Sequence, residues 1–94
     1  MEKLHQVRKY IRFYGWVQGV GFRYVARMAA ERSGATGWVR NEFDGSVSME
    51  IQGTERDIDS VLQALGSGGY IRIEHIETRD IPVLADERGF RVRY

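Results

Sequence analysis

The chain has 94 residues, which is enough for one domain with a single hydrophobic core and too short for two. It contains no cysteine, which excludes a disulfide framework, a thiolate metal site and a cysteine nucleophile. Its 14 Lys and Arg residues and 13 Asp and Glu residues give a net charge of +1, far below the basic excess typical of nucleic-acid-binding proteins. We therefore expect one domain over residues 1–94, with partners recognised at a local site.

The amino-terminal residues 1–6 are charged and polar and lack the apolar core of a signal peptide, and we expect them to be flexible. No segment of the sequence approaches eighteen consecutive apolar residues, so a membrane-spanning helix is not expected. These features predict a cytoplasmic protein without a membrane partner, and we expect it to be a monomer.

Residues 7–17 predict the first strand, because apolar side chains alternate there with basic and aromatic ones. The next apolar side chains recur at the i, i+3, i+4, i+7 spacing of a buried helix stripe, and they are Phe22, Val25, Ala26 and Ala29. Gly34 is the predicted end of this helix, since glycine favours the conformation that follows a last turn.

The middle of the chain predicts a hairpin followed by a second helix. Residues 36–41 form a short strand, residues 41–45 contain turn-forming Asn, Asp and Gly, and alternation resumes over residues 46–51. Thr54 then predicts a helix cap, with Asp57 three residues later in a near capping box. The apolar stripe of this helix is Ile58, Val61, Leu62 and Leu65, and Gly66 is its predicted end.

Residues 70–83 predict a long strand with a bulge between Ile73 and Ile76, where the apolar phase slips. Phe90, Val92 and Tyr94 predict a short last strand. The order β-α-β-β-α-β with one extra strand predicts an α+β fold, a ferredoxin-like two-layer sandwich with both helices on one face of a four- to five-stranded mixed or antiparallel sheet. The second strand of the hairpin is expected between the first strand and residues 36–41.

The glycine-rich stretch 15–23, which joins the first strand to the first helix, is a candidate anion site. Without a Cβ at Gly19 or Gly21, several N–H groups can face one point, and the first turn of the helix adds unpaired donors. Arg23, the second or third residue of that helix, can hold two oxygens of a phosphate or carboxylate. A glycine-rich turn of this kind can also be only a turn.

Asn41 ends the second strand, at the same end of the sheet as this stretch. The two strands are parallel and lie about 9–10 Å apart, twice the usual interstrand spacing, so an amide and a guanidinium can flank one phosphate with a water between them. An Asn before Asp and Gly also serves hairpin turns, so a structural role for Asn41 stays open at this point.

Two segments of the sequence resemble the signatures of the acylphosphatase family. The first is the stretch 15–23, Gly-Trp-Val-Gln-Gly-Val-Gly-Phe-Arg. The second comprises residues 37–41, Gly-Trp-Val-Arg-Asn, followed at the family's spacings by Gly45, Val47 and Gly53. The similarity in order and element type extends over nearly the whole chain. One departure is Trp16, at a position that is often basic in the family, and we expect it to change anion attraction at the mouth of the loop.

The resemblance implies a hydrolase that cleaves the carboxyl–phosphate anhydride of acyl phosphates to carboxylate and inorganic phosphate. It implies that Arg23 and Asn41 are catalytic, Arg23 by binding the phosphate and Asn41 by orienting the attacking water. The implied phosphate-binding residues are Gln18, Gly19, Val20, Gly21, Phe22 and Arg23. Inorganic phosphate is then expected to inhibit as the product.

We expect no cofactor and no metal. The carboxylate leaving group departs without a proton, so no general acid is required. The sequence offers no close carboxylate pair near the loop, and His5 and His75 are too isolated to indicate a zinc site.

An alternative interpretation comes from the basic and aromatic side chains of the first strand, which are Arg8, Tyr10, Arg12 and Tyr14. A sheet of this architecture with aromatics on its open face is typical of one RNA-binding module. Because the neighbouring strand offers Ser46, Ser48 and Glu50 instead of aromatics, a solvated sheet face is favoured and a nucleic-acid partner is not expected. A noncatalytic anion- or RNA-binding module of the same fold is the alternative to the enzyme.

Overall fold

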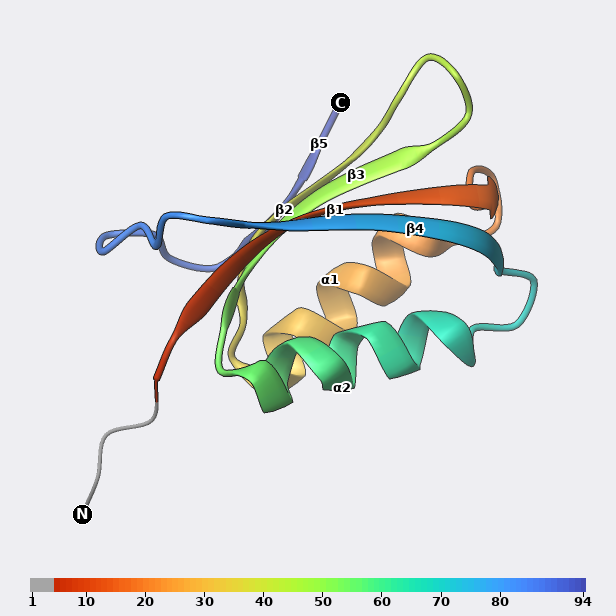
Figure 1. The fold of residues 1–94 in the computed structure, drawn as a ribbon. Coiled ribbons are helices and arrows are strands. Elements are labelled where there is room, and N and C mark those ends of the chain that lie inside the picture. The colour runs from red at the N-terminus through yellow and green to blue at the C-terminus, as the bar shows by residue number, and fades with distance from the viewer. Residues whose placement is uncertain (1–4) are drawn as a thin grey trace.

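Two helices cover one face of a five-stranded sheet in the computed structural model, which describes residues 5–94 (Figure 1). The elements in chain order are β1 (Val7–Trp16), α1 (Phe22–Ser33), β2 (Thr36–Asn41), β3 (Val47–Gly53), α2 (Glu55–Gly66), β4 (Arg72–Ile81) and β5 (Phe90–Arg93). The predicted ferredoxin-like order with one extra strand is confirmed. Residues 1–4 of the predicted flexible terminus lie outside the described residues, and His5 and Gln6 have no regular secondary structure.

The strand order in the sheet is β4-β1-β3-β2-β5. As predicted, β3 lies antiparallel between β1 and β2, with Val47 opposite Phe13 of β1 and also opposite Asn41 of β2. β5 pairs parallel with β2, so the sheet is mixed. Because β1 and β2 run in the same direction on either side of β3, the loop after β1 and the end of β2 reach the same end of the molecule.

The core lies between the sheet and the helices. From the sheet it contains Ile11, Phe13, Val39, Val47, Met49 and Ile51, and from the helices Phe22, Ala26, Ala30, Ile58, Val61 and Leu65. The rings of Phe13 and Phe22 meet edge to face, with centroids 4.9 Å apart. Phe22 is the first residue of α1, so this aromatic contact fixes the start of the helix, and with it the end of the glycine-rich loop, against β1.

The two helices begin differently. α2 begins with the predicted capping box, in which Thr54 accepts a hydrogen bond from the Asp57 N–H and the Asp57 carboxylate accepts one from the Thr54 N–H. α1 begins after Gly21 without a side-chain cap and has no acidic residue in its first turn. Its first intrahelical bond runs from the Val25 N–H to the Gly21 carbonyl, so the preceding N–H groups have no partner within the helix. Within residues 5–94, neither helix is long and apolar enough to cross a membrane.

A bulge in β4 confirms the predicted phase slip. Tyr14 pairs with His75 and Gly15 with Ile73, which leaves Glu74 as the extra residue. Gly15 has a φ of 127°, and a Cβ there would lie 2.4 Å from the Arg72 carbonyl oxygen. Gly15 is therefore required by the close approach of β4 and belongs to the sheet rather than to the anion loop.

The predicted solvated face of the sheet is wrong for Arg8, whose exposed fraction is 2%. Its guanidinium donates to the Gln52 side chain at 3.1 Å and forms ion pairs with Glu50 at 2.9 Å and Glu87 at 2.6 Å. Glu87 comes from the segment between β4 and β5, and the same segment meets Gln52 through the N–H and carbonyl of Leu84. This long-range cover removes Arg8 from the surface that an RNA would contact.

Candidate active site

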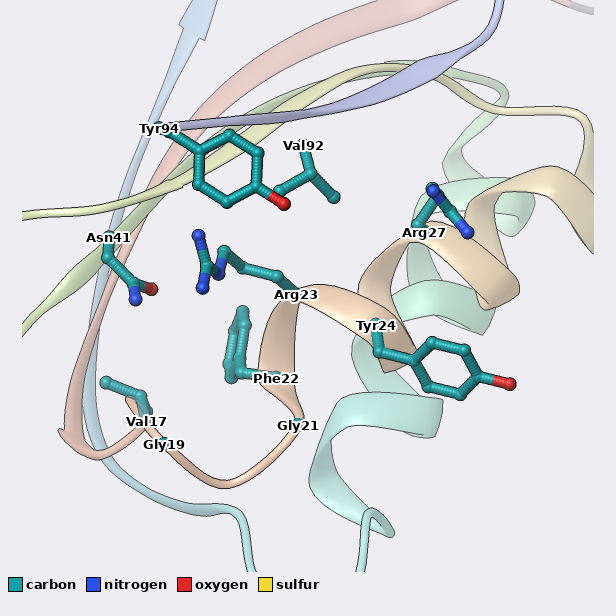
Figure 2. Close-up of a pocket in the computed structure, with 10 residues that line it drawn as sticks. All are labelled: Val17, Gly19, Gly21, Phe22, Arg23, Tyr24, Arg27, Asn41, Val92 and Tyr94. Carbon is teal, nitrogen blue, oxygen red and sulfur yellow. The ribbon is translucent and has the colours of Figure 1, made fainter.

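The loop between β1 and α1 turns back through two glycines in the left-handed region. Gly19 has a φ of 72° and Gly21 a φ of 82°, and no atom would meet a Cβ at either position. Backbone conformation, rather than lack of space, is therefore the reason for glycine at both positions. In Figure 2 the loop curves around one end of a pocket and leads directly into the first turn of α1.

The pocket has a volume of about 300 Å³ and lies between the glycine loop, the first two turns of α1, the end of β2 and the end of the chain. Four of the six predicted phosphate-binding residues line it, and they are Gly19, Gly21, Phe22 and Arg23. Asn41 lines it as well, so the structure brings the two predicted catalytic side chains together. Val20 does not line the pocket and packs against the core instead.

Arg23 is the second residue of α1 and is half-buried. Its guanidinium lies over the ring of Tyr94, with its central carbon 5.0 Å from the ring centroid. No carboxylate of the described residues forms an ion pair with it, and its side chain points toward Asn41 (Figure 2). The Arg23 charge is thus supported from one side by an aromatic ring and remains available to an anion in the pocket.

Asn41 is the last residue of β2, and its Oδ1 is buried without a hydrogen-bond partner in residues 5–94. In the hairpin turn that follows Asn41, Asp44 Oδ1 accepts a hydrogen bond from the Ser46 N–H at 2.9 Å. The turn is therefore closed by another side chain. Because a buried acceptor without a partner costs roughly 1–3 kcal/mol, the Asn41 carbonyl is a feature that a bound molecule would satisfy.

The Gln18 side chain connects the loop to the turn that follows Asn41. Its Nε2 donates to the Glu42 carbonyl at 2.8 Å and to the Ser46 carbonyl at 2.9 Å. Both amide protons are used in this way, so only the backbone of Gln18 remains to serve the predicted phosphate site. The side chain instead holds the glycine loop and the end of β2 at a fixed separation.

Comparison with known proteins agrees with this geometry. The Acylphosphatase family profile matches residues 9–92, nearly the whole described chain. The chain belongs to the acylphosphatase family.

Relatives named acylphosphatase are similar over almost their full lengths. The protein from Salinibacter ruber is 44% identical over 96 residues, covering 99% of both chains. The protein from Bifidobacterium longum is 42% identical over 89 residues, covering 93% of this chain and 92% of the relative. The crystal structure of acylphosphatase from Bacillus subtilis superposes with a TM-score of 0.85 at 31% identity, covering 94% of this chain and 99% of that chain. The chain is therefore an acyl phosphate hydrolase with a small-molecule substrate, and the noncatalytic alternative is not favoured.

The pocket also contains residues that were not predicted from the sequence as site residues. Tyr94 and Val92 come from the end of the chain, and their place beside α1 depends on the parallel pairing of β5 with β2. Arg27 lies one helical turn after Arg23, and its four-residue spacing from Arg23 is a signal that was visible in the sequence.

Glu42 is the carboxylate nearest in sequence to Asn41, and it is held ionised in this acylphosphatase. Its side chain accepts hydrogen bonds from Ser48 and from Arg40, the latter at 3.1 Å. The Ser48 hydrogen bond is the main cause that lowers the Glu42 pKa, with a further contribution from Arg40. A carboxyl group that is ionised at neutral pH has no proton to give to a leaving group. Within residues 5–94, no group of three or more His, Asp and Glu side chains is arranged to hold a metal ion.

Proposed function

We propose that this acylphosphatase binds the phosphoryl group of its substrate between the glycine loop and Arg23, and that Asn41 orients the water that attacks phosphorus. The observation that carries this proposal is the unpartnered Asn41 Oδ1, which is buried and faces the same pocket as Arg23. A water held by this oxygen would satisfy it and would lie beside a phosphate at the loop.

The loop and the start of α1 supply the phosphate site. The N–H groups of residues 18–23 belong to the turn and to the uncapped first turn of the helix, where the partial positive charge favours an anion. Arg23 adds a planar fork that donates to two phosphate oxygens at once. Since no carboxylate of residues 5–94 pairs with Arg23, its charge is not already neutralised.

The reaction then requires positioning rather than an ionisable side chain. The Asn41 amide is neutral and cannot take a proton, so its carbonyl accepts a hydrogen bond from water and aligns the water oxygen with phosphorus. As the new P–O bond forms, the bond between phosphorus and the acyl oxygen breaks, and the carboxylate leaves with the electron pair. A phosphate oxygen takes the water proton, and the loop N–H groups and Arg23 match the charge on the oxygens.

Inorganic phosphate, the product, keeps the contacts of the transferred group. It should therefore compete with substrate for the loop. A ligand that binds only the folded state raises the melting temperature by mass action, so phosphate should also stabilise the fold.

Hydrolysis of acetyl phosphate in EDTA tests the metal-free mechanism. We expect wild-type phosphate release to be unchanged by EDTA and competitively inhibited by inorganic phosphate, with Arg23→Lys as the control for spontaneous hydrolysis. Loss of activity in EDTA that added Mg²⁺ restores would show a metal-dependent hydrolase instead. Activity without any inhibition by phosphate at tens of millimolar would contradict the assignment of the loop.

A further inference from the structure

We propose that Arg27 and Val92 form an acyl-group subsite selective for acyl phosphates whose acyl chain ends in a second anionic group, such as a carboxylate. The inference rests on the proposed function, because the subsite is defined by its place relative to a phosphate at Arg23. It adds a substrate class to that function.

Two pairs of side chains that line the pocket define the subsite, one pair from α1 and one from the end of the chain at β5. Arg27 lies four residues after Arg23 on α1, so the two side chains project from the same face, about 5–6 Å apart along the helix. Val92 lies in β5 and Tyr94 directly follows the strand, and both side chains line the same pocket. In the pocket, Arg23 and Tyr94 therefore lie nearer to the glycine loop, and Arg27 and Val92 lie farther from it.

Figure 2 shows the same order in space. Arg23 points toward Asn41, while Arg27 lies at the far side of the pocket from Asn41, beyond Val92. A substrate with its phosphate at the loop can extend its acyl chain over Val92, and the end of a short chain then reaches Arg27. The isopropyl group of Val92 supplies the apolar surface that a methylene chain requires.

The charges around Arg27 and Val92 favour a bound anion. Arg27 is exposed and forms no ion pair with a carboxylate of residues 5–94, although Glu31 follows it by one helical turn. Among residues 5–94, none of the side chains that line the pocket is acidic. An exposed arginine on a helix commonly serves solubility alone. Arg27 differs because it shares a cavity with the phosphate site and is separated from it by an apolar surface.

The spacing sets the length of the preferred acyl group. A second anionic group must lie about one helical turn, roughly 5–6 Å, from the phosphate to reach Arg27 when the phosphate is held at Arg23. A succinyl chain has this reach, whereas an acetyl group ends near Val92. The reaction is otherwise unchanged: water adds to phosphorus and the dicarboxylate leaves.

The test compares succinyl phosphate with butyryl phosphate, which has the same number of carbons and no terminal charge. The measured quantity is the ratio of kcat/KM for the two substrates, in wild type, Arg27→Gln and Arg27→Glu. Because an exposed charge-assisted contact is modest, we expect the ratio to fall about fivefold to tenfold in Arg27→Gln. It should fall further in Arg27→Glu, and the wild-type ratio should decrease with salt.

Arg32→Gln is the matched control, since Arg32 is a basic residue of the last turn of α1 and does not line the pocket. Its ratio should equal that of wild type. The proposal is overturned if the ratio is unchanged in Arg27→Gln, or if Arg32→Gln lowers it equally, which would show only a long-range effect of charge. Failure of wild type to hydrolyse either compound would instead contradict the proposed function, so the two failures are distinguishable.

Discussion

Arg8 and Arg23 are arginines of one small fold in opposite surroundings. The Arg8 side chain is 1% exposed and meets the carboxylates of Glu50 and Glu87 together with the Gln52 amide. Arg23 is half-buried beside an uncapped helix start, its guanidinium lies over the Tyr94 ring, and it forms no ion pair with a carboxylate of residues 5–94. A guanidinium whose donors are used contributes to stability, whereas one whose donors face a pocket is available for a ligand.

The same contrast holds for the neighbouring polar groups. Burial of Arg8 acts to lower its pKa, but the hydrogen bonds to Glu87 and Glu50 outweigh it and raise the pKa overall. Burial acts to raise the pKa of Glu87, and the hydrogen bond from Arg8 reverses this and lowers it. The charge of Arg8 is thus compensated within the fold by Glu50 and Glu87. At the pocket, the Asn41 Oδ1 has no partner among residues 5–94. In the proposed mechanism, the attacking water supplies that partner.

Arg23→Lys should give the largest effect on the pocket side of the comparison. Lysine offers a single point charge in place of the bidentate fork, and we expect phosphate release from acetyl phosphate to fall by at least roughly 10³-fold. The unfolding midpoint should stay near that of wild type, because no carboxylate of residues 5–94 forms an ion pair with Arg23. Equal rates for the two proteins would remove Arg23 from the mechanism.

Asn41→Ala should lower kcat by about 10²- to 10⁴-fold, because it removes the oxygen that aligns the attacking water. Stability should not decrease as it would on loss of a turn residue, since the Asn41 Oδ1 makes no hydrogen bond within residues 5–94. The measurements are kcat and the unfolding midpoint on one preparation. A near-normal kcat with a lowered midpoint would show that Asn41 serves the fold.

Arg8→Met should have the opposite effect, lowering stability while leaving activity nearly unchanged. It leaves two carboxylates without their cation, and we expect a loss of about 3 kcal/mol in the free energy of unfolding, the low end for a broken buried ion pair because both carboxylates keep some access to water. The kcat of the folded molecules should remain within about twofold of wild type. Urea unfolding with Arg32→Met as the control measures the loss. A stability equal to that of the control would show that the Arg8 cluster is not a stabilising element.

Gln18→Ala should give the smallest effect, roughly tenfold in kcat, because it releases the turn after Asn41 without removing a reacting group. The inhibition constant for phosphate should change little. If the inhibition constant for phosphate rises by the same factor as kcat falls, the Gln18 side chain binds phosphate directly, and its hydrogen bonds to the Glu42 and Ser46 carbonyls are of secondary importance.

The positions of Arg23 and Asn41 were predictable because they depend on strand order and side-chain alternation, which the apolar pattern determines. The hydrogen bonds of the Gln18 side chain could not be predicted from the sequence. Their acceptors are backbone carbonyls 24 and 28 residues away, and every residue type has such a carbonyl. Burial of Arg8 depends on Glu87, 79 residues away, in an irregular segment without periodicity. The single domain, the monomeric state, the cytoplasmic location and metal independence stay predictions.

The most direct test of the proposed roles, phosphate binding by Arg23 and water orientation by Asn41, is the dissociation constant of inorganic phosphate, measured by titration calorimetry in EDTA. Wild type and Asn41→Ala should bind phosphate within about threefold of each other, and Arg23→Lys should bind at least about tenfold more weakly, the scale of a lost charge-assisted hydrogen bond. Equal affinity in wild type and Arg23→Lys, or loss of binding in Asn41→Ala, would contradict this division of roles.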